Sequence, residues 1–195
     1  MAAHARDVNI FIWTSRKSVG HGTNDLIKVH GNGTRADGRR SGYRALYARS
    51  WAREDRRPAP SIEGFFWHQG WSDAIGDRPE EYGADLSNLI RDVRKDLGVE
   101  MPWTIGVSGM GGYRPYTDTQ CTGALDVLTD TIIPAQFSVA NGITVSAVET
   151  RAFHREARFS PGDQCYHWNN NCESYWRVGV AMGESMLELI SRRKY

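Results

Sequence analysis

The chain has 195 residues, a formal net charge of +1 and 40% hydrophobic residues, an ordinary composition for a globular protein. This composition excludes a disordered chain, and the length can form one domain with a substantial core. The small net charge gives the chain no strong electrostatic attraction to nucleic acid or to a membrane surface. No apolar run approaches the roughly 20 residues that cross a bilayer.

The first residues, 1–7, lack the apolar core of a signal peptide. We therefore expect a cytoplasmic protein by default, and a secreted one if the N-terminus of the sequence is incomplete. Composition and motifs do not predict the oligomeric state.

Short apolar runs alternate with longer segments that have helical patterns. Five runs rich in β-branched or aromatic residues predict strands: 8–13, 26–30, 62–67, 103–107 and 143–148. Four segments predict helices: 43–53, 79–97, 124–139 and a last one that ends at Ser191. Strands that alternate with helices imply βαβ units. We therefore predict one α/β domain over residues 1–195, a three-layer α/β/α sandwich with a mainly parallel central sheet.

Several residues mark where the predicted helices begin and end. Asp77 is a candidate N-cap for the helix at 79–97, and Gly98 ends it. Pro134 is expected to kink or interrupt the helix at 124–139, because proline lacks a backbone N–H. Asn170 or Asn171 is expected to cap the last helix.

The chain has three cysteines: Cys121, Cys165 and Cys172. An odd count is not a disulfide framework, and free buried thiols are the favoured interpretation. The alternative is a local bridge between Cys165 and Cys172, which lie close together in the sequence. There is no Cys-x-x-Cys pair and no metal-binding spacing of histidines, so we predict neither a metal nor an organic cofactor.

Two polar clusters lie where the chain changes direction. The predicted strand at 62–67 runs into Trp67–Asp73 (WHQGWSD), and Asp163–Trp168 (DQCYHW) comes shortly before the last helix. In open α/β folds, ligands bind at the carboxyl ends of the strands. We therefore expect the two clusters to converge on one site, as they would in an enzyme.

These clusters and their order resemble the sialate O-acetylesterase-like, or acetylxylan-esterase-like, branch of the SGNH hydrolase superfamily. The segments that carry the resemblance are 26–34 (LIKVHGNGT), 67–73 (WHQGWSD), 82–97 with Pro102-Trp103, Ala135-Gln136, and 163–167 with Tyr175 and Gly179. The resemblance covers most of the chain from Leu26 onward. It implies an SGNH-type, flavodoxin-like domain, shortened near its N-terminus, that releases acetate from a sugar of the sialate or acetylxylan type.

The family hydrolyses esters with a serine nucleophile, a histidine base and usually a carboxylate that orients the base. Carried over by position, His167 is the general base and Asp163 orients it, one residue farther away than in the common Asp-x-x-His pattern. Gln69 is then an oxyanion donor through its side-chain amide, and Gly31 or Gly33 through a backbone N–H.

The nucleophile block departs from the family's Gly-Gln-Ser-Asn-Met, although a following Val-Gly-His-Gly is retained at 19–22. Alignment from that element without a gap puts Arg16 at the serine position. A slip of one residue puts Ser15 there, and Ser18 is a third choice. We expect Ser15 to be the nucleophile. The equal alternative is a catalytically inactive relative that binds carbohydrate.

Two tryptophans are predicted to bind substrate. Trp71 stands where the family usually has Glu, and its indole can stack on a sugar face. Trp168 follows the predicted base directly. For His68, in the first cluster, we favour a structural role that satisfies backbone groups at the end of the strand.

The stretch 35–57 is rich in arginine. A solvated helix face is the favoured interpretation; contact with nucleic acid or with an acidic sugar is the alternative. The expected partner is a small-molecule or polysaccharide acetyl ester. Neither nucleic acid nor a membrane is expected as a partner.

Overall fold

The structure, a computed structural model, describes residues 9–15, 24–30 and 61–193. The predicted helix at 43–53 and the whole arginine-rich stretch, 35–57, lie outside the described residues. Ser18, Gly31 and Gly33 lie outside them too, so their predicted roles stay predictions. Within the described residues, no helix is both long enough and apolar enough to cross a bilayer.

The fold is built on a five-stranded sheet with the order β2-β1-β3-β4-β5. The strands are β1 (Asn9–Ser15), β2 (Asn24–His30), β3 (Ser61–His68), β4 (Trp103–Gly106) and β5 (Val145–Val148). Each begins and ends within two residues of its predicted limits. The predicted α/β fold is confirmed, and β3, β4 and β5 are parallel, as βαβ units require.

The N-terminal strands differ from the parallel arrangement expected of a mainly parallel sheet. β1 runs antiparallel to both of its neighbours, β2 and β3. Only residues 16–23 connect β1 to β2, which is too short for the crossover of a dozen or more residues that parallel neighbours need. The sheet is therefore mixed, with its parallel half on the side of the later strands.

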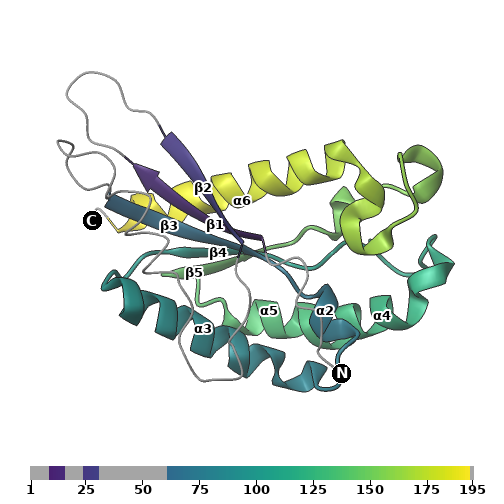
Figure 1. Ribbon diagram of the computed structural model, residues 1–195, viewed down its shortest axis with the longest axis horizontal. Coiled ribbons are helices and arrows are strands. Elements are labelled where there is room, and N and C mark those ends of the chain that lie inside the picture. Colours follow the sequence, from purple (N-terminus) through teal and green to yellow (C-terminus); the bar gives the residue numbers. More distant parts are fainter. Residues whose placement is uncertain (1–8, 16–23, 31–60, 194–195) are drawn as a thin grey trace.

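Helices cover both faces of this sheet and complete the three layers (Figure 1). α6 (Cys172–Arg192) lies on one face, and α3 (Tyr82–Leu97) and α5 (Ile133–Val139) lie on the other. Phe65 and Trp103 stack with ring centroids 3.8 Å apart in the buried centre of the sheet. The remaining short elements are α2 (Trp71–Ala74), η1 (Pro79–Glu81), η2 (Thr119–Cys121), α4 (Thr122–Val127), η3 (Leu128–Ile132), η4 (Arg151–Phe153), η5 (Ala157–Phe159) and η6 (Cys165–Asn170).

The helix limits follow local signals in most places. Gly98 adopts φ of 67° and ends α3, as predicted for a left-handed C-cap. Asn171 caps α6: its side-chain oxygen accepts hydrogen bonds from the backbone N–H groups of Glu173 and Ser174. The predicted Asp77 cap is wrong, because the turn η1 precedes α3 and Glu81 occupies the N-cap position.

The helix predicted over 124–139 is interrupted, as Pro134 required. α4 continues into the π-helical turn η3 and then into α5, whose first turn contains Pro134. π-helical segments are rare, and most of them are single turns of this kind inside an α-helix. Gln136, two residues beyond the proline, is fully buried.

The cysteine predictions are wrong. Cys121 and Cys165 form a disulfide, with their Cα atoms 6.6 Å apart, and Cys172 is free and exposed. Proximity in the sequence made Cys172 the candidate partner of Cys165. The fold instead brings Cys165 next to Cys121, which lies 44 residues earlier in the chain.

Candidate active site

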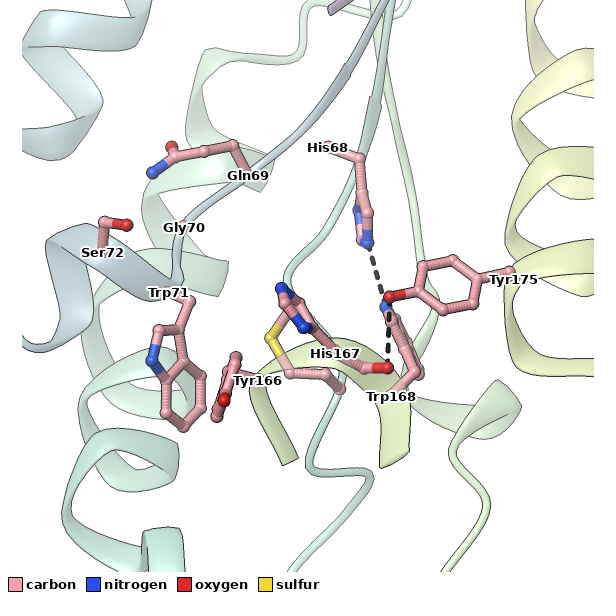
Figure 2. Close-up of a pocket in the computed structure, with 10 residues that line it drawn as sticks. His68, Gln69, Gly70, Trp71, Ser72, Tyr166, His167, Trp168 and Tyr175 are labelled. Carbon is pink, nitrogen blue, oxygen red and sulfur yellow. Dashed lines mark hydrogen bonds between the residues drawn. The ribbon is translucent and has the colours of Figure 1, made fainter. Parts of the chain in front are cut away.

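A pocket opens at the carboxyl end of β3, and both predicted polar clusters line it (Figure 2). Its lining residues are His68, Gln69, Gly70, Trp71, Ser72, Met110, Tyr166, His167, Trp168 and Tyr175. The expected convergence of the two clusters is thus confirmed. Within the described part of the chain, no group of three His, Cys, Asp or Glu residues is arranged to hold a metal ion.

The turn after β3 is fixed through the carbonyl oxygen of Gln69. That oxygen accepts hydrogen bonds from the Tyr82 hydroxyl at 2.8 Å, the Ser108 hydroxyl at 2.9 Å and the Gln136 amide at 2.7 Å. These donors come from α3, from the loop after β4 and from α5. Burial raises the pKa of Tyr82, so its hydroxyl keeps its proton and remains a donor.

Gln136 is the centre of this network. Its side-chain oxygen accepts from the backbone N–H of Ser108 at 2.9 Å, and its amide nitrogen also lies 3.0 Å from the Tyr82 hydroxyl. A buried amide must find such partners, because an unsatisfied one is costly. The Ala135-Gln136 signal in the sequence therefore marks a residue that joins three elements behind the pocket.

The side chain of Gln69 is engaged within its own turn. Its amide donates to the carboxylate of Asp73 at 2.5 Å, and in Figure 2 it extends toward Ser72 and away from His167. The predicted oxyanion donor thus lies at the pocket with one of its N–H groups already used. Its role in stabilising an oxyanion stays a prediction.

His68 ends β3 and makes two hydrogen bonds. Nδ1 lies 2.8 Å from the carbonyl oxygen of Gly106, and Nε2 lies 3.1 Å from the indole nitrogen of Trp168, which donates to it. The expected contact with backbone at the end of the strand is confirmed. Burial lowers the pKa of His68, which favours the neutral ring that these two bonds require.

The two predicted substrate-binding tryptophans differ in exposure. Trp168 lines the pocket but is only 1% exposed, so its ring offers almost no free face to a ligand. Trp71 is half-buried, and its ring centroid lies 5.7 Å from that of the exposed Tyr166. Tyr166 is an aromatic residue that sequence reasoning missed, although it directly precedes His167.

The predicted base, His167, is half-buried in η6, the turn Cys165–Asn170, which we call the His167 turn. Its Nδ1 lies 3.4 Å from the side-chain oxygen of Gln164, and its carbonyl oxygen accepts from the Tyr175 hydroxyl at 3.1 Å. Asp163 is exposed. The role of Asp163 in orienting the ring stays a prediction.

The His167 turn has an unfavourable backbone. Trp168, Asn169 and Asn170 adopt φ of 54°, 53° and 58°, a left-handed conformation that costs about 1–2 kcal/mol for an ordinary residue and less for Asn. Asn169 is buried, and its amide donates to the carboxylate of Asp118 at 2.7 Å. The Cys121–Cys165 disulfide fixes the start of the same turn. Tertiary contacts therefore hold a conformation that the local chain disfavours.

A second histidine supports the loop that faces this turn. Nδ1 of His154 lies 2.7 Å from the carbonyl oxygen of Met110, and its Nε2 lies 3.6 Å from the carboxylate of Asp118. Met110 lines the pocket, and Asp118 holds Asn169. No local pattern predicts the contact between His154 and Asp118, because the two residues are far apart along the chain.

Among the described site predictions, neither Asp163 nor Ser15 lines the pocket, and Ser15 lies far from it along the sheet. The register of β1 and β3 pairs Asn9 with His68 but Ser15 with Ser61, at the opposite end of β3. Ser61 and His68 are seven positions apart along β3, a distance of roughly 23 Å. A nucleophile must lie within hydrogen-bond reach of its base, so this register does not support Ser15 in that role. Ser72 is a serine that does line the pocket.

Comparison with known protein families identifies the family of this chain. A family model described as carbohydrate esterase, sialic acid-specific acetylesterase, matches residues 14–151, which is more than half of the chain. The matched region contains Gln69 and Gln136 and ends before His167. Among curated proteins and among solved structures, the search found no match. The chain belongs to the carbohydrate esterase family of sialic acid-specific acetylesterases.

Proposed function

We propose that this protein is a serine-type carbohydrate O-acetylesterase, with His167 as its general base and an acetylated sugar of the sialate or acetylxylan type as its substrate. Family membership supports carbohydrate esterase activity at the general level. The observation that carries the finer proposal is the pocket at the end of β3, because Gln69 and His167 both line it.

In the proposed reaction, His167 takes the proton of a serine hydroxyl as its oxygen attacks the acetyl carbonyl carbon. The carbonyl oxygen becomes an oxyanion, and the Gln69 amide, turned from Asp73 toward the substrate, donates a hydrogen bond to it. The bond between the acetyl carbon and the sugar oxygen then breaks, and His167 gives the proton to that oxygen, which leaves as a hydroxyl. Water, activated by the same histidine, releases acetate from the acetyl-enzyme.

The serine remains to be assigned. The family resemblance favours Ser15 or Ser18, whereas the described pocket contains Ser72. Removing each hydroxyl in turn separates these candidates, because loss of a nucleophile removes the covalent step itself.

The sugar is proposed to contact Trp71 and Tyr166. Their rings are close together beside His167, with the Tyr166 and His167 ring centroids 4.6 Å apart. Aromatic rings offer a flat apolar surface to the C–H face of a sugar. Such stacking would hold the sugar next to the base while its acetyl group points into the pocket.

The test is acetate release from acetylated xylo-oligosaccharides, from O-acetylated sialic acid and from p-nitrophenyl acetate. The variants are His167→Ala, Ser15→Ala, Ser18→Ala and Ser72→Ala, each checked for folding by circular dichroism. We expect His167→Ala and one serine variant to lose activity. Full activity in folded His167→Ala would refute the proposal. Binding of a sugar ester without hydrolysis by folded wild type would point instead to a non-catalytic relative.

A further inference from the structure

We propose that His68 is a positioning residue: its Nε2 accepts the Trp168 indole N–H and thereby holds the turn that presents His167 to the substrate. This inference rests on the proposed role of His167 as the base. It gives a function to a histidine whose side chain otherwise only satisfies a backbone carbonyl.

The two hydrogen-bond partners of His68 determine its protonation state. Its Nδ1 faces a carbonyl oxygen, which can only accept, and its Nε2 faces an indole N–H, which can only donate. The one form of the ring that satisfies both partners is neutral, with the proton on Nδ1. The other tautomer would set N–H against N–H and a lone pair against the carbonyl oxygen.

His68 is itself held firmly in the sheet. It ends β3, and the carbonyl it contacts belongs to Gly106, which ends β4. A Cβ atom on Gly106 would lie 2.6 Å from the sulfur of Met182 and 3.1 Å from Nδ1 of His68. The imidazole therefore packs closely against the parallel part of the sheet, with little room to shift.

The His167 turn depends on contacts with other parts of the fold. Trp168 follows His167 directly and has a left-handed backbone, which is unfavourable for a large side chain. Its indole is buried, stacks near the His68 ring with centroids 5.9 Å apart, and has its N–H satisfied by His68. Figure 2 shows this contact reaching from the end of β3 to the residue beside the base.

Loss of the hydrogen bond between Trp168 and His68 is expected to slow the reaction. A buried indole N–H without a partner is costly, so the turn shifts to find another one. His167 then leaves its reacting position, and a displacement of about 1 Å is enough to cost roughly 100-fold in rate. Substrate binding depends mainly on other lining residues, so the loss falls on kcat more than on KM.

A matched pair of substitutions tests the contact. In His68→Gln the side-chain oxygen can reach the former Nε2 position and accept from Trp168. In His68→Asn the amide can reach only the Nδ1 position and Gly106. We expect His68→Asn to lower kcat by about 10- to 100-fold with KM nearly unchanged, and His68→Gln to restore much of that loss. In a His167→Ala background, His68→Asn should cause no further decrease in the residual rate.

A second readout does not depend on activity. The Trp168 indole N–H signal in the NMR spectrum, identified by its absence in Trp168→Phe, should shift in His68→Asn and remain near its native position in His68→Gln. An unchanged signal in His68→Asn, or a residual rate that falls further in the His167→Ala background, would overturn the inference. Failure of the proposed function has a different signature, namely His167→Ala with full activity.

Discussion

Replacing both Cys121 and Cys165 by serine tests how strongly the disulfide supports the His167 turn. The bridge closes a loop of 44 residues. In the chain-entropy model, a loop of that length restricts the unfolded chain by about 13 cal/mol/K, or about 4 kcal/mol at 25 °C. That is a large share of the roughly 5–15 kcal/mol that stabilises a typical domain. Activity should fall as well, because Cys165 begins the turn that contains His167.

The assay is urea unfolding followed by circular dichroism, with acetate release measured on the same samples. Cys172→Ser is the matched control, because Cys172 is free and exposed and should tolerate the change. An unfolding free energy for the double variant within about 1 kcal/mol of wild type would contradict the reasoning, since it would leave the bridge without its expected effect. Rapid labelling of three thiols in native, unreduced protein would contradict it directly.

Three further predictions concern the turn after β3 and its surroundings. Tyr82→Phe should lower the unfolding free energy by about 1–3 kcal/mol, because the Trp67 indole N–H, 3.1 Å from the hydroxyl, loses its acceptor. Chemical denaturation measures this change. An unchanged unfolding free energy would mean that the indole finds another partner. Gly70→Ala should lower both the unfolding free energy and kcat, because a Cβ atom there collides with the Ser108 hydroxyl and lies 2.8 Å from Ile132. Gly123→Ala is the matched control and should lower neither, because a Cβ atom at that position has no neighbour within 4 Å. The unfolding free energy should decrease as the pH falls below about 6.5, because burial lowers the pKa of His68 and the unfolded chain takes up the proton first. Denaturation at several pH values should show a smaller decrease in His68→Gln. An equal decrease in that variant would show that other groups cause the pH dependence.

Local signals in the sequence predicted much of the fold. Gly98 and Asn171 mark helix ends through their own backbone and side-chain chemistry, so their neighbours suffice to read them. The strands were recognised from β-branched and aromatic runs of the right length. The direction of β1 was not predictable in this way, because pairing with β3 depends on tertiary contacts and leaves the local pattern unchanged.

The candidate site was predicted in part. The two polar clusters were correctly expected to meet, because the first follows a strand at its carboxyl end and the second lies at another change of chain direction, before the last helix. The hydrogen bond between His68 and Trp168 joins residues 100 positions apart, and the disulfide joins residues 44 positions apart. Neither contact could be predicted from a local sequence pattern. Trp168 was expected to face a sugar because its type suits stacking, but exposure depends on the left-handed turn that buries it.

The π turn at Leu128–Ile132 has a consequence for comparing this chain with its relatives. Each residue advances an α-helix by about 100°, so one residue gained or lost before Gln136 would swing that side chain away from Ser108. An insertion of one residue is accommodated by a π turn, which keeps the downstream helix in phase. A relative with a regular helix here should therefore be one residue shorter between Leu125 and Gln136, and an alignment should place its gap within the π turn.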